Sequence, residues 1–110
     1  MAFRISTRPR VKERVSLIIE VDGEKLDNSF DATFQILPVS RTTEETMSTD
    51  EGQRAMLAEA LVDLGDLVDE AGAPVPFTPE LRDALADRIE VRVALLKAYQ
   101  AAATRAAAGN

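Results

Sequence analysis

The side chains that most often carry out chemistry in proteins are missing from this sequence. Its 110 residues include no histidine and no cysteine, which excludes thiol catalysis, the common nucleophile and base pairs, and cysteine-ligated zinc. Carboxylates, lysines and one tyrosine remain as candidate catalytic groups. We therefore expect a protein that is not an enzyme and that has no catalytic residue.

The densest group of carboxylates lies in the stretch DLGDLVDE. Asp63, Asp66, Asp69 and Glu70 follow helical spacing, not the one-three-five spacing of a calcium-binding loop. The five glycines are scattered and form no phosphate-binding loop. The sequence therefore predicts a solvated acidic helix end, with no metal site and no cofactor site.

The single tyrosine, Tyr99, lies in an apolar stripe at helical spacing. A tyrosine in such a stripe is typical of core packing, with its hydroxyl at the edge of the core. We expect this packing role for Tyr99 and no catalytic role.

The net charge of −6 is unevenly distributed. Residues 1–14 are basic, with Glu13 as their one carboxylate, whereas residues 42–87 are acidic, with Arg54 and Arg82 as their cations. The pattern is typical either of a solubilising surface or of self-association and binding to an oppositely charged protein. The acidic region would be repelled by nucleic acid, so we expect no nucleic-acid partner.

Two strands are predicted before Pro38. Apolar residues alternate from Val11 to Val21, and again from Phe30 to Ile36. Asp22-Gly23 is a tight-turn signal between them, residues 24–26 allow a short extra strand, and residues 27–29 form a second group of turn formers. We expect an antiparallel hairpin spanning residues 11–37.

Three helices are predicted after Pro38, at about 49–66, 78–87 and 89–107. Two capping-box patterns, Thr42 with Glu45 and Ser48 with Glu51, precede the first helix, which begins once or follows a short turn. Thr78 followed by Pro79 is a strong start signal for the second helix. The apolar stripe of the first helix is expected to contain Leu57, Leu61, Leu64 and Val68.

Prolines 74, 76 and 79 punctuate the link between the first two helices. Proline restricts its own backbone and that of the residue before it, so residues 73–77 are expected to cross the protein as a stiff extended strap. Phe77 is expected to be buried between the first and last helices, which makes the strap structural; a partner-binding strap is the alternative.

The predicted fold is α+β: an N-terminal antiparallel β-hairpin packed on a bundle of about three α-helices. We expect one domain over residues 1–110, divided into a basic arm (1–10), the hairpin (11–37), a helical part (43–107) and a frayed tail (108–110). The longest run of large apolar residues, SLIIEV, is far shorter than the roughly eighteen residues of a membrane span, and no secretory signal is visible. We expect a cytoplasmic protein without a membrane partner.

The last helix is apolar over a wide arc, and the hairpin is expected to have Ile18 and Leu37 on the face opposite its main apolar row. Surplus apolar surface of this kind is typical of partner binding or of weak self-association. The candidate partner-binding residues are Val91, Leu95, Tyr99, Ile18 and Leu37.

The stretch LVDLGDLVDEAGAPVPFTPELRDALADRIEVRVALLKAYQAA, residues 61–102, resembles the C-terminal half of the tail assembly chaperones of long, non-contractile-tailed phages and prophages. The shared patterns are an acidic D-E-x-G-x-P-x-P-F-[ST]-P-E link and a V-R-x-A-L-x-x-A-Y helix. This chain supplies Asp69, Glu70, Gly72, Pro74, Pro76, Phe77, Thr78, Pro79 and Glu80, then Val91, Arg92, Ala94, Leu95, Ala98 and Tyr99. It has Asp66 after Gly65, where many relatives have tryptophan.

The resemblance covers residues 11–102 and implies an accessory, non-enzymatic role. Members of this family bind the long helical tape measure protein, keep it soluble, help recruit tail tube subunits, and are not part of the mature virion. The alternatives are a minor virion structural or head–tail connector protein, and a regulatory module that binds nucleic acid through its basic arm.

Overall fold

The computed structural model describes residues 2–5 and 8–108 of the chain. The element order is β1 (Arg10–Val21), β2 (Glu24–Gln35), η1, a 3-10 helix (Val39–Arg41), α1 (Glu44–Met47), α2 (Asp50–Ala60), β3 (Leu61–Gly65), α3 (Pro79–Ala86) and α4 (Ile89–Ala107). The α+β class and the leading hairpin are confirmed. The expectation of about three helices was slightly low, because the described part of the chain contains four α-helices.

The hairpin is more regular than predicted, because its second strand is continuous. β1 and β2 pair over their whole length, and Val21 lies opposite Glu24. Asp22 and Gly23 join them with φ angles of 52° and 80°, a left-handed conformation that suits Asp-Gly turns. The expected turn at residues 27–29 is wrong: these residues continue β2 opposite residues 16–18.

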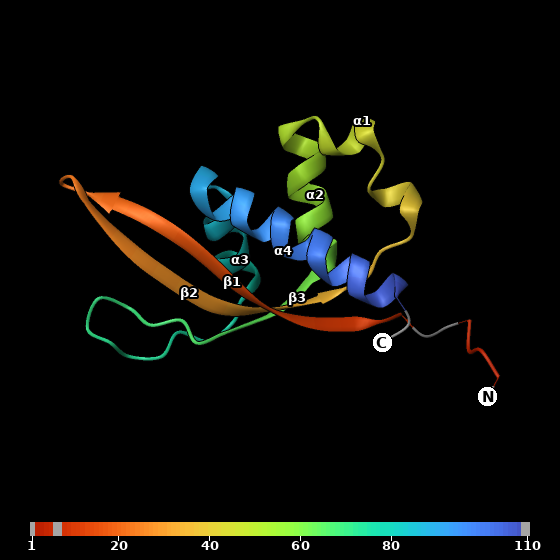
Figure 1. The fold of residues 1–110 in the computed structure, drawn as a ribbon, viewed down its shortest axis with the longest axis horizontal. Helices are drawn as coiled ribbons and strands as arrows, with labels where there is room; N and C mark the ends of the chain where they lie inside the picture. The colour runs from red at the N-terminus through yellow and green to blue at the C-terminus, as the bar shows by residue number, and fades with distance from the viewer. Residues whose placement is uncertain (1, 6–7, 109–110) are drawn as a thin grey trace.

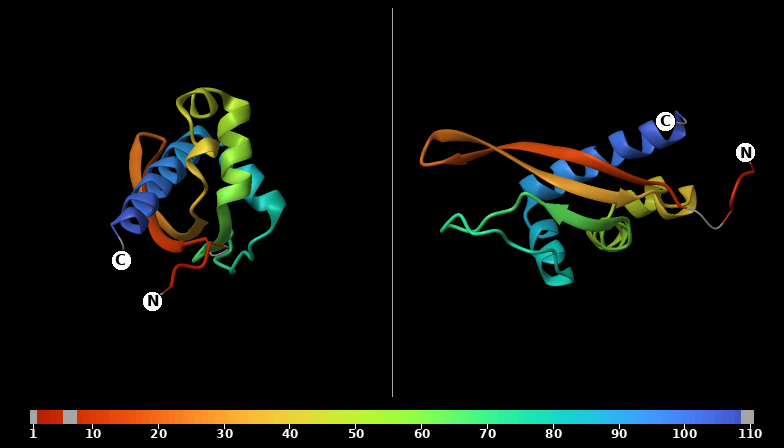
Figure 2. Two further views of the ribbon diagram at one scale, coloured as in Figure 1. Left: turned by 90° about the vertical axis from the view of Figure 1, so that its right-hand side faces the viewer. Right: turned by 90° about the horizontal axis from the view of Figure 1, so that it is seen from below.

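One face of the sheet carries the core. Val15, Phe30, Ala32 and Phe34 are buried on this face, and α4 crosses it (Figure 1). Side chains at even positions of β1 point to the opposite face and are exposed, as expected for an antiparallel sheet with one solvated side. The far half of the hairpin extends beyond the helices (Figure 2), so the molecule measures 52 × 31 × 25 Å.

The first predicted helix ends earlier than expected, at Ala60, and is followed immediately by β3. β3 pairs with β2 in an irregular register, in which Phe34 lies opposite Leu61 and Thr33 opposite Asp63. Val62 is the extra residue of a β-bulge, so Leu61 and Leu64 both face the core although they are three residues apart. This bulge explains why a strand here has the apolar spacing of a helix.

The other helices lie where the sequence places them. Thr78 caps α3 by accepting a hydrogen bond from the backbone N–H of Leu81 at 3.0 Å, and Pro79 is the first helical residue. The caps of α1 and α2 are Thr43 and Thr49, each one residue after the predicted cap. A short helix therefore precedes α2, which was one of the two alternatives.

The proline-containing link is not a strap across the protein. The backbone N–H of Val75 donates to the carbonyl of Leu67 at 2.8 Å, and that of Asp69 donates to the carbonyl of Ala73 at 2.9 Å. Residues 67–75 thus fold back on themselves as a narrow loop that extends to the same side as the hairpin tip (Figure 2). Phe77 is half-buried against the core, not enclosed between two helices.

The two ends of the described chain lie at one end of the molecule, opposite the hairpin tip (Figure 1). Of the predicted basic arm, residues 1, 6 and 7 lie outside the described residues, as do residues 109 and 110 of the predicted tail. Within the described residues, no helix has the length and apolar character needed to cross a bilayer.

Candidate functional site

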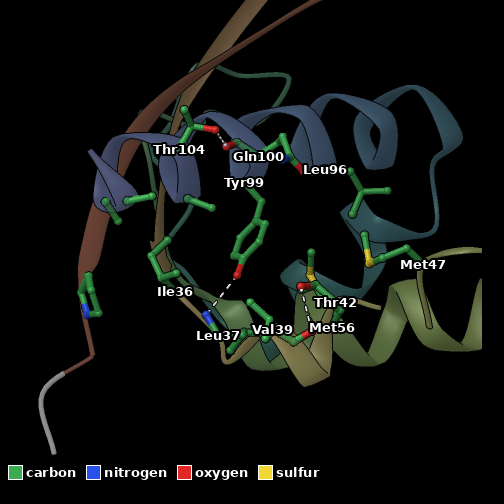
Figure 3. A pocket seen from close by; sticks show the side chains of 14 residues that line it. Ile36, Leu37, Val39, Thr42, Met47, Met56, Leu96, Tyr99, Gln100 and Thr104 are labelled. Carbon is green, nitrogen blue, oxygen red and sulfur yellow. Dashed lines mark hydrogen bonds between the residues drawn. The ribbon is translucent and has the colours of Figure 1, made fainter. Parts of the chain in front are cut away.

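An apolar groove lies between the C-terminal half of α4 and the segment that links β2 to α1 (Figure 3). It encloses about 610 Å³. Most of its lining side chains are apolar, and none is charged. They are Pro9, Ile36, Leu37, Val39, Thr42, Met47, Met56, Leu96, Tyr99, Gln100, Ala103, Thr104, Ala106 and Ala107.

Tyr99 fixes the floor of the groove. Its hydroxyl accepts a hydrogen bond from the backbone N–H of Leu37 at 3.0 Å, and its ring meets that of Phe34 edge to face at a centroid distance of 5.6 Å. Tyr99 is 6% exposed. The hydroxyl thus satisfies a buried donor just after β2 ends, and this bond holds the β2–η1 segment against α4.

Two methionines form one wall. Met56 is buried in α2, and Met47 is half-buried at the end of α1; together they account for two of the three methionines in the sequence. Gln53 fixes the end of α1 by donating from Nε2 to the carbonyl of Met47 at 2.8 Å. Because methionine is unbranched and polarizable, this wall can adapt to apolar partners of different shape.

The polar groups of the groove are mostly satisfied within the protein. The Thr104 hydroxyl donates to the carbonyl of Gln100 at 2.9 Å, and the Thr42 hydroxyl donates to that of Val39 at 3.5 Å. Val39 lies at the rim and is 87% exposed. A partner in this groove would therefore be held by buried apolar surface more than by a pattern of hydrogen bonds.

Charged groups lie near the groove but outside it. Glu59 is within ion-pair distance of Arg8 and Arg41, at 3.6 and 3.8 Å. Arg8 precedes the groove residue Pro9, and Arg41 belongs to η1. Such partly exposed pairs add little affinity, but they place two cations close to the rim.

A separate cluster of charged side chains, centred on Arg92 and Asp50, has a structural role. The buried guanidinium of Arg92 donates to the carbonyl of Ala86 at 2.7 Å and to the Asp50 carboxylate at 2.6 Å. Asp50 also pairs with Arg54, which in turn binds Asp87. Hydrogen bonds from Arg92, and next from Arg54, hold the pKa of Asp50 below its usual value. This cluster joins α2, α3 and α4, and its carboxylates are all engaged by arginines.

The predicted partner-binding residues are not gathered into one surface. Val91 and Leu95 are buried in the core, and Leu37 and Tyr99 are also buried but line the groove. Ile18 is 61% exposed on the solvated face of the hairpin. Leu37 follows β2 and points inward, so the expectation that it lies on the opposite face of the hairpin is wrong.

Sequence reasoning missed the residues that make the groove open, above all Val39, Met47 and Ala103. The one sequence signal of the groove is that it contains two of the three methionines of the chain, Met47 and Met56.

The acidic group at residues 63–70 was expected at a helix end; it lies instead in β3 and the following loop. Asp66 pairs with Arg14 at 2.8 Å, and Asp69 accepts backbone hydrogen bonds from Ala71 and Ala73.

Among residues 2–5 and 8–108, no group of three or more carboxylates could hold a metal ion. Comparison of the chain with family models, with curated proteins and with solved structures finds no match. The function is therefore inferred from the residues of this chain and their arrangement.

Proposed function

We propose that this protein is a tail assembly chaperone of a long, non-contractile-tailed phage or prophage. It binds apolar helical stretches of the tape measure protein in the α4 groove, keeps that protein soluble in the host cytoplasm, and helps recruit tail tube subunits. It leaves before the virion is complete, and it performs no chemistry on its client.

The observation that carries this proposal is the uncharged groove with methionines in one wall. A helix lies in such a groove by inserting apolar side chains that recur every three or four residues. The groove offers depth for several large side chains and few directional hydrogen bonds. It therefore suits a client that presents many different apolar sequences in one helical form.

The resemblance of residues 61–102 to this family adds independent support. The residues that it shares include Tyr99, which forms the floor of the groove, and Leu95, which is buried in the core on the same helix. The shared motif thus coincides with the element that forms the groove.

Co-expression with the tape measure protein of the same phage tests the proposal. We expect the client to be soluble with this protein and to aggregate without it. Val39→Asp places a carboxylate at the apolar rim, and we expect it to weaken client binding about tenfold, because the apolar surface that the client would cover is lost and a charge must be desolvated on binding.

Ser40→Asp is the matched control, because Ser40 is an exposed neighbour that does not line the groove. Both variants should melt at the same temperature as the parent protein. Equal solubility of the client with and without this protein would contradict the chaperone proposal, and equal binding by the two variants would contradict the groove as its site.

The position of the protein after assembly separates this proposal from its alternative. A chaperone is expected to be absent from purified virions, whereas a minor structural or connector protein would be present in a fixed number of copies. Its recovery in purified particles would favour the structural role.

A further inference from the structure

The outer edge of β1 has no backbone partner in the described part of the chain. The sheet order is β1-β2-β3, and β1 pairs on its inner side over all of its 12 residues. Arg105 donates to the carbonyl of Lys12 at 3.0 Å, which shows that the backbone groups of even-numbered residues face outward. Arg14, Ser16, Ile18 and Glu20 therefore present free hydrogen-bonding groups.

The middle of this edge lacks the usual protection against pairing. Natural proteins blunt edges with prolines, bulges or central charges. β1 contains no proline, since Pro9 precedes it, and no bulge, since its pairing with β2 is regular. Its centre is Ser16, which lies between Arg14, whose guanidinium is engaged by Asp31 and Asp66, and the 61% exposed Ile18. Arg105 covers the edge only at Lys12.

The exposed charges of β1 change sign along the strand. Arg10, Lys12 and Arg14 lie at its start, while Glu20 and the turn residue Asp22 lie at its end, all with exposed side chains. A second copy of β1 laid antiparallel places the basic start of each strand against the acidic end of the other. A parallel arrangement would place like charges together, which is unfavourable.

We infer that two copies of this chain pair through their β1 edges to form a six-stranded antiparallel sheet about a two-fold axis. The axis passes between the two Ser16 residues. Lys12 then lies opposite Glu20 of the second copy, whose backbone N–H replaces Arg105 as the donor to the Lys12 carbonyl, and Arg10 lies beside its Asp22. Each of these contacts occurs twice, because the interface is self-complementary.

The same register matches the apolar side chains. A two-fold axis perpendicular to the sheet keeps both core faces on one side, so Val15 lies beside Leu17 of the second copy and Val11 beside its Val21. The flank of α4 near Ala101 has a shallow hollow of about 560 Å³ next to Glu13. The hairpin tip of the second copy extends toward this hollow, which gives its partly exposed Val21 a surface to pack on.

This inference is independent of the proposed function, because the β1 edge does not line the α4 groove. Arg14 retains its bonds to Asp31 at 3.1 Å and to Asp66 at 2.8 Å, and its aliphatic stem covers Ile18 of the second copy. Both grooves of the pair remain open.

Cysteine cross-linking tests the register directly, since the chain has no cysteine of its own. Residues facing each other in a hydrogen-bonded antiparallel pair have Cα atoms about 5.5 Å apart, which suits a disulfide. We expect the Ser16→Cys variant to form a disulfide-linked dimer under mild oxidation. The exposed Ser40→Cys variant, at the same concentration, should stay monomeric. Equal cross-linking of the two variants, or none, would overturn the inference.

Charge exchange tests the same interface without a covalent bond. By sedimentation velocity, we expect Lys12→Glu and Glu20→Lys each to raise the dimer dissociation constant about tenfold, because each places two like-charge pairs in the interface. The double variant should restore dimerisation. Both residues are exposed, so melting temperatures should change little. A double variant as weak as the single variants, or a parent protein that is monomeric at every concentration, would show that the edges do not pair.

Discussion

Asp50 is the residue through which α2 and α4 are held together. It is the first residue of α2 and binds Arg92 of α4 and Arg54 of its own helix. In the unfolded chain this carboxyl is protonated near its ordinary pKa of about 3.9, whereas in the folded protein its pKa is lower. The pairing therefore stabilises the fold above the ordinary pKa, and its contribution is lost as the pH falls through the folded value.

We accordingly expect Asp50→Asn to be less stable than the parent protein at neutral pH. Its stability should also depend less on pH below about pH 4, because one group with a lowered pKa is gone. Urea unfolding at a series of pH values measures both effects. Glu51→Gln removes an exposed carboxylate from the same helical turn and is the control; its stability at neutral pH should be close to that of the parent. An unchanged slope in Asp50→Asn would show that the pairing does not act as described.

The hydroxyl of Tyr99 has a structural role, because it accepts the hydrogen bond of the buried Leu37 N–H. Tyr99→Phe keeps the ring but leaves the buried N–H of Leu37 without an acceptor, which should lower the free energy of unfolding by about 1.5 kcal/mol. Chemical denaturation of the variant measures this loss. Thr104→Val removes another hydroxyl from the same helix, where it bonds to the carbonyl of Gln100, and should cost less because its site is exposed. A fully stable Tyr99→Phe protein would mean that water replaces the hydroxyl.

The core role of Tyr99 could be predicted from its helical stripe, but its hydrogen-bond partner could not. Leu37 lies 62 positions away in the sequence, and apolar periodicity indicates which face of a helix is buried without indicating what covers it. The same limit applies to Arg92, whose partners Asp50 and Ala86 lie on two other elements.

The junction between α1 and α2 depends on the absence of a side chain at Gly52. A Cβ atom placed there would lie 1.9 Å from the carbonyl oxygen of Thr46, so the two helices approach each other closely. In most helices Gly→Ala stabilises. Here we expect Gly52→Ala to lower the free energy of unfolding by about 2 kcal/mol, because the backbone of α1 must move.

Gly65→Ala provides the comparison within the same protein. Its new Cβ would lie 3.7 Å from Cβ of Asp31, an ordinary contact distance, and its stability should be close to that of the parent. Thermal unfolding of both variants measures the difference. Because Met47 lines the groove, Gly52→Ala should also weaken client binding, and equal melting temperatures for the two variants would contradict the tight junction.

Sequence patterns predicted a helix or strand correctly where one apolar period holds over the whole element, and they failed where that period changes within it. α3 begins at a clear signal, a threonine cap followed by proline, and α3 and α4 both lie where predicted. β3 was missed because its bulge gives two core residues the spacing of a helix, and because no turn residue separates it from α2. The length of β2 was underestimated because Asp27-Asn28-Ser29, a typical turn sequence, lies in the exposed part of the hairpin where a strand needs little apolar character.

The groove is formed by four stretches that lie far apart in the sequence. Its walls come from the C-terminal half of α4, from residues 36–47, from Met56 of α2 and from Pro9. The fold class was predictable because period two changes to helical spacing near Pro38. The groove was not, because no local pattern indicates that these four stretches meet.

The core is completed by α4, the last of the elements that the structure describes. Leu95, Tyr99 and Ala102 cover the aromatic face of the hairpin, and they are synthesised after every strand. Until α4 has been synthesised, the hairpin has Phe30 and Phe34 uncovered, and the groove lacks its floor and the wall that α4 provides. A product that stops before α4 would therefore expose the aromatic face of its sheet, and we expect it to aggregate instead of binding a client more weakly.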